Sequence, residues 1–523
     1  MSTSTAPLFF PEALQSPGLW TALGKTHGLT RKDFEWFSHL QLSTHESRNQ
    51  QTPPMLAEKV LVSTGTLSLP LAGCFVLSST PDDKGEILYT PYAGIKKFDS
   101  RTALSRQIKS KLDSAGEDHD LLAFMSLSAR KTLAAATDIK VTFKTIAGDV
   151  FEDQRADIEN SQRSNNQAMI DELQKLPTLN ALLDTVLDEL LKADFPGLDQ
   201  RRTQVSFYAE TANNLADAQS SKSRQLTHSM SLSEAALSYY RHQRWPIGQR
   251  AEYSHPQRKA LAADQQRWET AIKRAANDLI SRLSSQLQRY WNQASADGAT
   301  RRAFVSRAIG EKARAELLLK REDQVITPEQ SRALDPLINP TTGTSTTLTV
   351  ETVRLWEYQA NYVELAGSLM ISQDSSNAFL YTPAHGLQVL KDYQDLKATL
   401  QKKSMVAGHD DELYELLSLE ERQRFIGFDQ PQVSGAVVSG SVFTTLFETV
   451  ITKQLQNMEY AFQVLRHSDG AVNIQAYFDK ALDIRSMIGE QLLTLETQGR
   501  WSTRPVLSGE QPSMVLGTRR RVS

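Results

Sequence analysis

The sequence has one cysteine, Cys74, among 523 residues. A single cysteine excludes an intramolecular disulfide framework and any metal site built from several thiolates, and it suits folding in a reducing cytoplasm. The chain also lacks a run of about 18 apolar residues, so we expect no transmembrane helix. Its formal net charge of −3 provides no general attraction to nucleic acid or to an anionic membrane.

Known catalytic motifs are missing as well. The sequence has no Gly-x-Ser-x-Gly elbow, no phosphate loop, no dinucleotide-binding glycine fingerprint and no His-Glu-x-x-His zinc motif. His45-Glu46 matches half of a zinc deaminase motif, but no Pro-Cys-x-x-Cys follows it. We therefore predict no catalytic, cofactor-binding or metal-binding residue, and no cofactor.

The most informative feature that is present is an internal repeat. The tetrapeptide Leu-Tyr-Thr-Pro occurs at residues 88–91 and again at 380–383, an offset of 292. With this offset and no gap, residues 88–165 match residues 380–457 at 20 of 78 positions, well above chance. The identical positions include Gly94, Leu104, Gly116, Asp118, Ser126, Leu127, Arg130, Val150, Phe151, Gln162 and Asn165.

Each copy is expected to begin with a β-hairpin followed by helices. In copy one, an apolar run at 71–78 and a second run at 87–90 flank a cluster of turn residues. Leu104, Ile108 and Leu112 then recur every four residues, which predicts a short helix with one buried face. Shorter helices and one long helix complete the unit.

Polar residues in both copies are typical of helix caps. Asp99 or Ser100 in copy one, and Asp392 in copy two, stand where the first helix begins. Asp118 and Asp410 stand before the next helix. The pair Ser418 and Glu421 has the spacing of a capping box for the helix after that, whereas copy one keeps only the serine at this place.

These patterns predict an α+β fold that is predominantly helical, with two copies of a hairpin-plus-helices unit joined by a helical middle segment with a long helix. Apolar residues from Leu261 to Tyr290 hold a helical period, which predicts one helix of roughly 35 residues. The polar stretch 217–229 is predicted to be a loop. The predicted domains are an N-terminal segment (1–54), repeat unit 1 (55–175), a helical middle region (176–345), repeat unit 2 with C-terminal helices (346–505) and a flexible tail (506–523).

Several side chains have a chemical interpretation and a structural one. Asp118-His119-Asp120 and His409-Asp410-Asp411 could serve a metal or an acid–base reaction, but their histidines are out of register by two, so capping is favoured. Cys74 has apolar neighbours and is expected to be buried rather than nucleophilic. Glu420-Glu421 is expected to cap a helix.

The long helix at 441–466 and the tryptophans raise two further alternatives. The helix could insert in a membrane, but its charged residues make a core role the favoured interpretation. Trp245, Trp268 and Trp291 lie near arginines and could stack on nucleic-acid bases. At this net charge an ordinary solvated surface is favoured, and nucleic acid is not an expected partner.

Short motifs along most of the chain resemble one known family. They are the hairpin that ends in Leu-Tyr-Thr-Pro and the segments 98–101, 288–291, 315–319, 481–485 and 499–501. From about 60 to 505, the chain is similar to the dermonecrotic-toxin-like domain found at the N-termini of large toxin and effector proteins of soil and plant-associated bacteria. In that family the domain often precedes leucine-rich repeats and a ubiquitin-ligase or other effector domain. The family's catalytic residues lie in those parts, which this sequence does not contain, so none is carried over.

The resemblance implies a bacterial toxin- or effector-associated protein. It would act by binding an unknown protein partner, either a host target or the secretion machinery, or by delivery into a target cell. Two alternatives stay open: an enzyme with an unfamiliar site in the cleft between the two copies, and a membrane-perturbing toxin. A membrane is the less favoured partner. Residues 1–5 predict no cleaved secretory signal, so we expect folding in the bacterial cytoplasm, with secretion or injection that needs no such signal as a compatible route.

Overall fold

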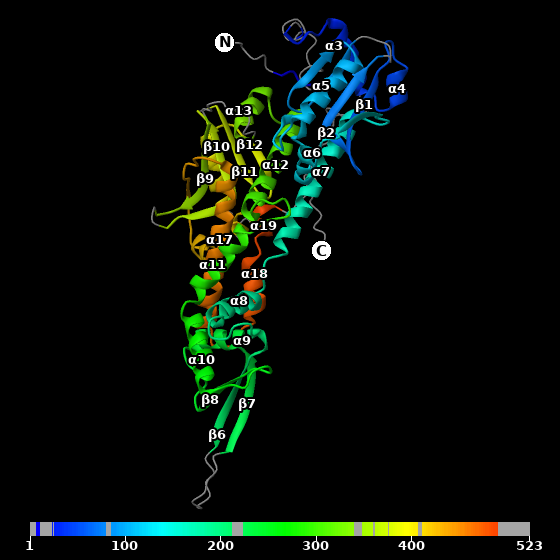
Figure 1. Ribbon diagram of the computed structural model, residues 1–523. Coiled ribbons are helices and arrows are strands. Elements are labelled where there is room, and N and C mark those ends of the chain that lie inside the picture. The colour runs from blue at the N-terminus through cyan, green and yellow to red at the C-terminus, as the bar shows by residue number, and fades with distance from the viewer. Residues whose placement is uncertain are drawn as a thin grey trace, which may run out of the picture. The chain divides into compact units, whose positions relative to one another are not determined.

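The fold is taken from a computed structural model, shown as a ribbon in Figure 1. The structure describes residues 7–10, 24, 26–79, 85–211, 223–338, 348–358, 361–374, 376–405 and 411–489. The predicted flexible tail, 506–523, lies outside these residues. The chain divides into two compact units: unit 1 is Met1–Asn166, Glu311–Thr346 and Leu492–Ser523, and unit 2 is Gln167–Gly310 and Thr347–Gln491.

The prediction of a predominantly helical fold was wrong. Among the described residues, helices account for 51% and strands for 22%, and these strands form three antiparallel sheets of five, three and five strands. The predicted hairpins exist, but each is the centre of a larger sheet. The outer strands were missed because they are partly exposed and carry polar residues, as in the Lys140–Thr145 strand.

Unit 1 is built around a sheet with the strand order β4-β3-β2-β1-β5. The strand bounds are β1 Leu56–Thr64, β2 Leu67–Ser78, β3 Glu86–Thr90, β4 Gly94–Phe98 and β5 Lys140–Thr145. Alternating side chains give the sheet two buried faces. One face packs on helices α5 (Arg101–Asp113), α6 (Leu127–Ala135) and α7 (Val150–Leu173), with η2 (Asp120–Leu122) between α5 and α6.

The opposite face of this sheet packs on N-terminal residues. Phe75 and Tyr89 point to this side, where Phe10 stacks on Phe75 at 5.6 Å between ring centroids. Phe37 adds an edge-on contact to Phe10 at 5.1 Å. The helices on this side are α3 (Arg31–Phe37), η1 (Ser38–Gln41) and α4 (His45–Asn49). The aromatic residues that the sequence places before residue 50 therefore complete the core of unit 1.

Unit 2 contains a second five-stranded sheet with the equivalent order, β12-β11-β10-β9-β13. Its strands are β9 Leu348–Trp356, β10 Val363–Gln373, β11 Asn377–Thr382, β12 Gly386–Leu390 and β13 Gln432–Ser434. Its helices are α14 Tyr393–Ser404, α15 Asp411–Glu415, α16 Leu419–Ile426 and α17 Val442–His467. The offset of 292 places β4 on β12 and the starts of α5, α6 and α7 on those of α14, α16 and α17.

Both copies carry the same irregularity in the second strand of the sheet. In unit 1, Lys59 pairs with Phe75 but Leu61 pairs with Pro70, so β2 contains extra residues. In unit 2, Val353 pairs with Leu365 while Glu351 pairs with Met370, and β10 bulges in the same way. The duplication therefore extends to a local distortion of the backbone.

The middle of the chain differs from its prediction at two places. The expected single helix over 261–290 is two helices, α10 (Ala262–Asn277) and α11 (Leu279–Asn292), interrupted at Asp278. The apolar period continues across the break, so the break could not be predicted from the periodicity. The polar stretch predicted as a loop contains a strand, β7 (Ser223–Ser231), between β6 (Gln204–Thr211) and helix α9 (Leu232–His242).

The three-stranded sheet of unit 2 has the order β7-β6-β8, with β8 at Gln249–Ser254. One face of it packs on helices α8 (Leu179–Leu191), α9 and α10, around the fully buried Trp268. The same core receives Met458 and Phe462 from α17 and Phe478 from α18 (Ile474–Leu482). The remaining elements are η3 Gln200–Arg202, α12 Arg301–Glu322, α13 Pro328–Ile338 and α19 Arg485–Ile488.

Candidate functional site

The acidic and histidine clusters do not form a reactive site in the described residues. The cap of η2 is His119, whose Nδ1 accepts a hydrogen bond from the backbone N–H of Leu121 at 3.1 Å. The prediction that Asp118 caps this element was therefore wrong. His409 and Asp410 lie outside the described residues. Capping by Ser100 and Asp392 is confirmed, since each accepts a backbone N–H in the first turn of its helix.

Cys74 lies inside the core of unit 1, as expected from its apolar neighbours. Burial raises the pKa of its thiol to about 12, and the nearby Asp157 carboxylate adds to this effect. A thiol with so high a pKa is protonated at neutral pH, which makes it a poor nucleophile.

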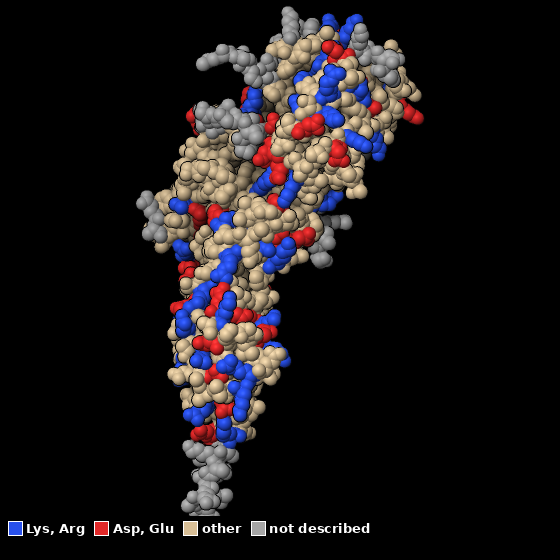
Figure 2. All heavy atoms as spheres, viewed as in Figure 1, with Lys and Arg blue, Asp and Glu red and all other residues tan. Residues whose placement is uncertain are grey.

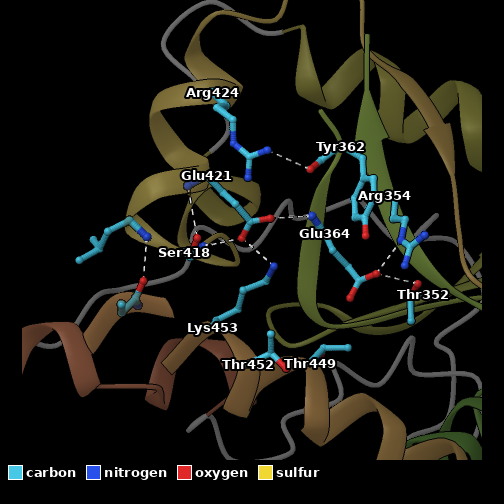
Figure 3. Close-up of polar contacts among 12 residues, drawn as sticks. Thr352, Arg354, Tyr362, Glu364, Ser418, Glu421, Arg424, Thr449, Thr452 and Lys453 are labelled. Atoms are coloured by element: carbon cyan, nitrogen blue, oxygen red, sulfur yellow. Dashed lines mark hydrogen bonds and ion pairs between the residues drawn. The ribbon is translucent and has the colours of Figure 1, made fainter. Parts of the chain in front are cut away.

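Glu421 belongs to a buried polar network in unit 2, shown in Figure 3. Its side chain accepts from the backbone N–H of Ser418 at 3.1 Å and completes the predicted capping box of α16. The same carboxylate accepts a hydrogen bond from Lys453 Nζ at 2.6 Å, and both side chains are almost fully buried. The backbone N–H of Glu364 in β10 donates to the other carboxylate oxygen at 2.9 Å.

The network continues across the sheet through Glu364. Arg354 Nε on β9 donates to Glu364 Oε2 at 2.8 Å, and the hydroxyl of Thr352 donates to the same oxygen at 3.1 Å (Figure 3). Each carboxylate is thus engaged by fixed donors from α16, α17 or the sheet. These contacts join helices to strands, and they explain Glu421, in the first turn of α16, as a structural residue.

The arginine conserved between the two copies has different surroundings in each. Arg130 is fully buried and forms an ion pair with Glu311, and its Nε donates to the carbonyl of Met125 at 3.1 Å. Its counterpart, Arg422, lies over the ring of Tyr414 at 4.9 Å from the centroid. The repeat therefore preserves the residue but not one common chemical role.

The three tryptophans considered for base stacking are used inside unit 2. Trp268 and Trp291 are fully buried. The indole N–H of Trp268 donates to Gln200, that of Trp291 donates to Gln454, and that of the partly buried Trp245 donates to Glu269 at 3.1 Å. Their rings and polar atoms are engaged by the protein itself, which favours a packing role.

A groove in unit 2 runs between α8 and α11 and has a volume of about 340 Å³. Its charged groups are paired across or along the groove. Arg289 Nη1 lies 2.6 Å from Glu189 Oε1, and Arg282 Nη2 lies 3.4 Å from Asp278 Oδ2. Ser281 and Ser285 line the groove, and no histidine is among its lining residues. It does not have the nucleophile–base arrangement of a hydrolytic site.

The three-stranded sheet offers a different kind of surface, and sequence reasoning missed it. In Figure 1, β6 and β7 project from the helices α8 to α10. Val205 and Phe207 point to the core, whereas Tyr208 points to the opposite face. The alternation of apolar and polar residues from 204 to 208 was the available signal for this strand. We define the exposed sheet face by Ser206, Tyr208, Arg224, Leu226, Ser229, Arg250 and Glu252.

The exposed sheet face combines one apolar group with paired charges. Leu226 is 52% exposed and pairs with Tyr208 on the neighbouring strand. The guanidinium of Arg224 lies over the ring of Tyr208 at 4.5 Å and forms an ion pair with Glu252. Figure 2 shows charges of both signs intermixed over this part of unit 2, on the face that it draws. Such a surface is suited to contact with a protein rather than with a polyanion.

The edge of this sheet is also open within the described chain. β7 pairs with β6 on one side, and no described strand pairs with its other side. Residues 224–229 of β7 are all exposed. An exposed edge strand presents unpaired backbone N–H and C=O groups, which form a template for another strand.

Among the described residues, no three His, Cys, Asp or Glu side chains come together to hold a metal ion. None of the described helices has the length and apolarity that crossing a membrane requires. The helix predicted at 441–466 is α17, and its Lys453 is buried against Glu421.

No protein-family description matches the chain, and no curated protein matches it either. The resemblance to the dermonecrotic-toxin-like domain therefore stays a prediction.

Proposed function

We propose that this protein acts by binding a partner protein, and that the partner adds an extended segment to the outer edge of β7. The single observation that carries this proposal is the open edge of the β7-β6-β8 sheet in the described chain. Strand addition gains affinity from main-chain hydrogen bonds, and side chains next to the edge provide specificity.

The side chains beside this edge favour contact with an apolar residue of the partner segment. A strand added to β7 places alternate side chains next to Leu226 on the exposed sheet face. Leu226 is half-exposed, and Tyr208 extends the apolar area beside it. Arg250, which pairs with Tyr208 on the neighbouring strand, borders this area and favours a partner segment that also carries an acidic residue.

The resemblance to the dermonecrotic-toxin-like domain supports a role in a toxin or effector system. In that role the bound protein is a host target or a component of a secretion machinery. The use of buried charged groups in helix caps and ion pairs is consistent with a binding protein, since these groups are held by the scaffold.

The test compares partner capture by the parent chain and by Leu226→Lys. A lysine on an edge strand opposes strand addition, so we expect the variant to lose the partner while keeping its thermal stability. The matched control is Ile426→Lys, which changes an equally exposed apolar residue at the end of α16. Proximity labelling in a eukaryotic cell and in a bacterial cell identifies proteins that are lost with the first variant and retained with the second.

A purified candidate partner then gives the decisive measurement. Binding through the β7 edge is expected to slow amide hydrogen exchange in residues 223–231. Binding that is unchanged by Leu226→Lys, or that protects only other segments, contradicts the proposed site. An activity that persists without any bound partner contradicts the binding function and favours the enzyme alternative.

A further inference from the structure

A row of aromatic rings crosses the core-facing side of the three-stranded sheet and reaches β7. Tyr239 of α9 packs on the indole of Trp245, with 5.1 Å between the ring centroids. Trp245 packs in turn on Phe207 of β6 at 5.3 Å. The imidazole of His228 on β7 stacks on Phe207 at 4.7 Å, with an angle of 13° between the two ring planes. These four residues, which we call the ring row, lead from α9 across β6 to β7.

The protein itself holds the inner part of the ring row in place. Phe207 is fully buried, and the indole N–H of Trp245 donates to Glu269 Oε1 at 3.1 Å. Beside His228, the hydroxyl of Thr227 donates to the backbone carbonyl of Phe207 at 2.7 Å and ties β7 to β6. Groups that are already ordered lose little further freedom when a partner binds to them. The ring row is therefore a preformed platform for contact.

His228 is the exposed end of the ring row. The residue is exposed, whereas Phe207 beneath it is not accessible to solvent. Because Phe207 belongs to β6, its ring covers the side of the imidazole that faces β6. The opposite side of the imidazole faces the outer edge of β7, where no described strand is paired. The ring row thus ends beside the backbone edge at which we propose that a partner segment is added.

His228 and Leu226 lie on opposite faces of the sheet. In the pairing of β6 with β7, Phe207 is opposite His228. The next residue of β6, Tyr208, is opposite Leu226, so Thr227 is an extra residue of β7. A strand added to β7 therefore meets Leu226 on one face and His228 on the other. Successive side chains of a strand alternate between faces, so the two partner residues that make these contacts are an odd number of positions apart.

We propose that the partner segment carries an aromatic residue that stacks on the outer side of His228, an odd number of positions from the apolar residue beside Leu226. This inference rests on the proposed function and names the kind of segment that fits the β7 edge. Aromatic pairs contribute binding energy beyond the area that they bury, and an aliphatic side chain on the same imidazole does not. A ring at this place extends the ring row by one member.

Peptide selection on the full chain tests the composition of the segment. The probe is a phage library of random peptides of about twelve residues, long enough to add a strand to the edge. Peptides that bind the parent chain but not Leu226→Lys depend on the β7 edge. We expect them to carry Phe, Tyr or Trp one or three positions from an aliphatic residue, at least about threefold more often than peptides that bind both chains.

Substitutions of His228 test its contact with one selected peptide by fluorescence anisotropy. His228→Val keeps a strand-forming residue but removes the ring, and we expect Kd to rise about 3- to 10-fold. His228→Phe keeps a ring at the same place and is expected to change Kd by less than about twofold. The control is His242→Ala, which removes an exposed imidazole from α9, outside the sheet, and leaves Kd unchanged. Thermal melts check that each variant is folded.

A double-variant cycle identifies the group that contacts His228. The aromatic residue of the peptide is replaced by leucine, and the effects of this change and of His228→Val are expected to be non-additive, because both remove one contact. Additive effects, equal binding by His228→Val, or edge-dependent peptides with an aliphatic or acidic residue in place of the aromatic one overturn this inference and leave the β7 site standing. If no peptide depends on Leu226, the inference is overturned together with the proposed function.

Discussion

Lys453 and Glu421 show how much one buried contact contributes at the residue scale. Their ion pair is 2.6 Å long, and both side chains are almost fully buried between α16 and α17. Lys453→Met leaves the carboxylate of Glu421 buried without its counter-charge, so we expect a loss of about 3–5 kcal/mol in the free energy of unfolding. Urea denaturation measures this loss.

An exposed ion pair provides the control for this prediction. Arg332 and Glu329 pair on the surface of α13 with both side chains more than half exposed. Arg332→Met is expected to change stability by less than about 1 kcal/mol. Equal effects of the two substitutions would show that the buried pair has no special role.

Glu322 is a residue whose charge depends on folding. It is buried in unit 1, and this burial raises its pKa from 4.5 to about 7, although Arg321 and Arg155 oppose the shift. Between these two values the folded protein keeps a proton that the unfolded chain has released. The stability that protonated Glu322 contributes to the free energy of unfolding is therefore fully present below about pH 4.5, and it is lost as the pH rises through 7.

Glu322→Gln keeps the side chain neutral at every pH. Relative to the parent, we expect the variant to gain stability as the pH rises from 4.5 to 7, by up to about 3 kcal/mol, and to gain nothing more above that range. Thermal melts of both proteins from pH 4.5 to 8.5 measure the difference. A difference that does not vary with pH would mean that Glu322 titrates normally.

At the scale of elements, the first helix after each hairpin carries the same core position. Leu104 of α5 and Leu396 of α14 are both fully buried. Truncation of either leucine to alanine is expected to lower the free energy of unfolding by about 2–5 kcal/mol, the usual cost of truncating a buried leucine. Separate denaturation curves for Leu104→Ala and Leu396→Ala measure each cost, and a neutral result for one of them would remove that helix face from the core.

The bulge in each copy contains a glycine, and both glycines have little room for a side chain. Gly73 has φ +81°, and an added Cβ would lie 2.4 Å from Pro91 Cγ. Gly367 has φ +63°, and its Cβ would lie 2.3 Å from the backbone oxygen of Met487. We expect each glycine-to-alanine change to cost more than about 1 kcal/mol, with Gly367 the more sensitive because backbone yields less than a proline ring.

Gly116 is the control for the bulge, since its Cβ would meet no atom within 4 Å and its φ is not positive. In thermal melts, the Tm of Gly116→Ala should equal or exceed that of the parent protein. Similar losses at all three glycines would mean that the bulge geometry is not the cause.

At the scale of the whole molecule, the proposed binding function predicts how activity responds to substitution. An alanine scan of exposed Asp, Glu, His, Arg and Tyr residues, measured by toxicity or partner binding, is expected to give graded losses that gather on one patch around β7. A binding surface distributes its energy over several contacts, whereas a catalytic site depends on a few polar groups. One substitution that abolishes activity while folding and partner binding remain intact would favour the enzyme alternative.

The sequence by itself determined the local features of this protein. The offset of 292 predicted two related units, and the spacing of Leu104, Ile108 and Leu112 predicted a buried helix face. The Ser418 and Glu421 pair predicted a capping box that the structure contains. The helix face and the capping box depend on neighbours within about one helical turn, so the order of residues is enough to specify them.

Only the tertiary structure decided which polar segments became strands and which contacts equivalent residues of the two copies make. β5 and β7 carry few apolar residues, and they are strands because β1 and β6 offer paired backbone groups beside them. Gln162 and Gln454 occupy equivalent positions of the two copies, but it is Gln454 that meets the indole of Trp291 and the carbonyl of Leu482. Long-range contacts of this kind depend on where distant segments fold, which no local pattern encodes.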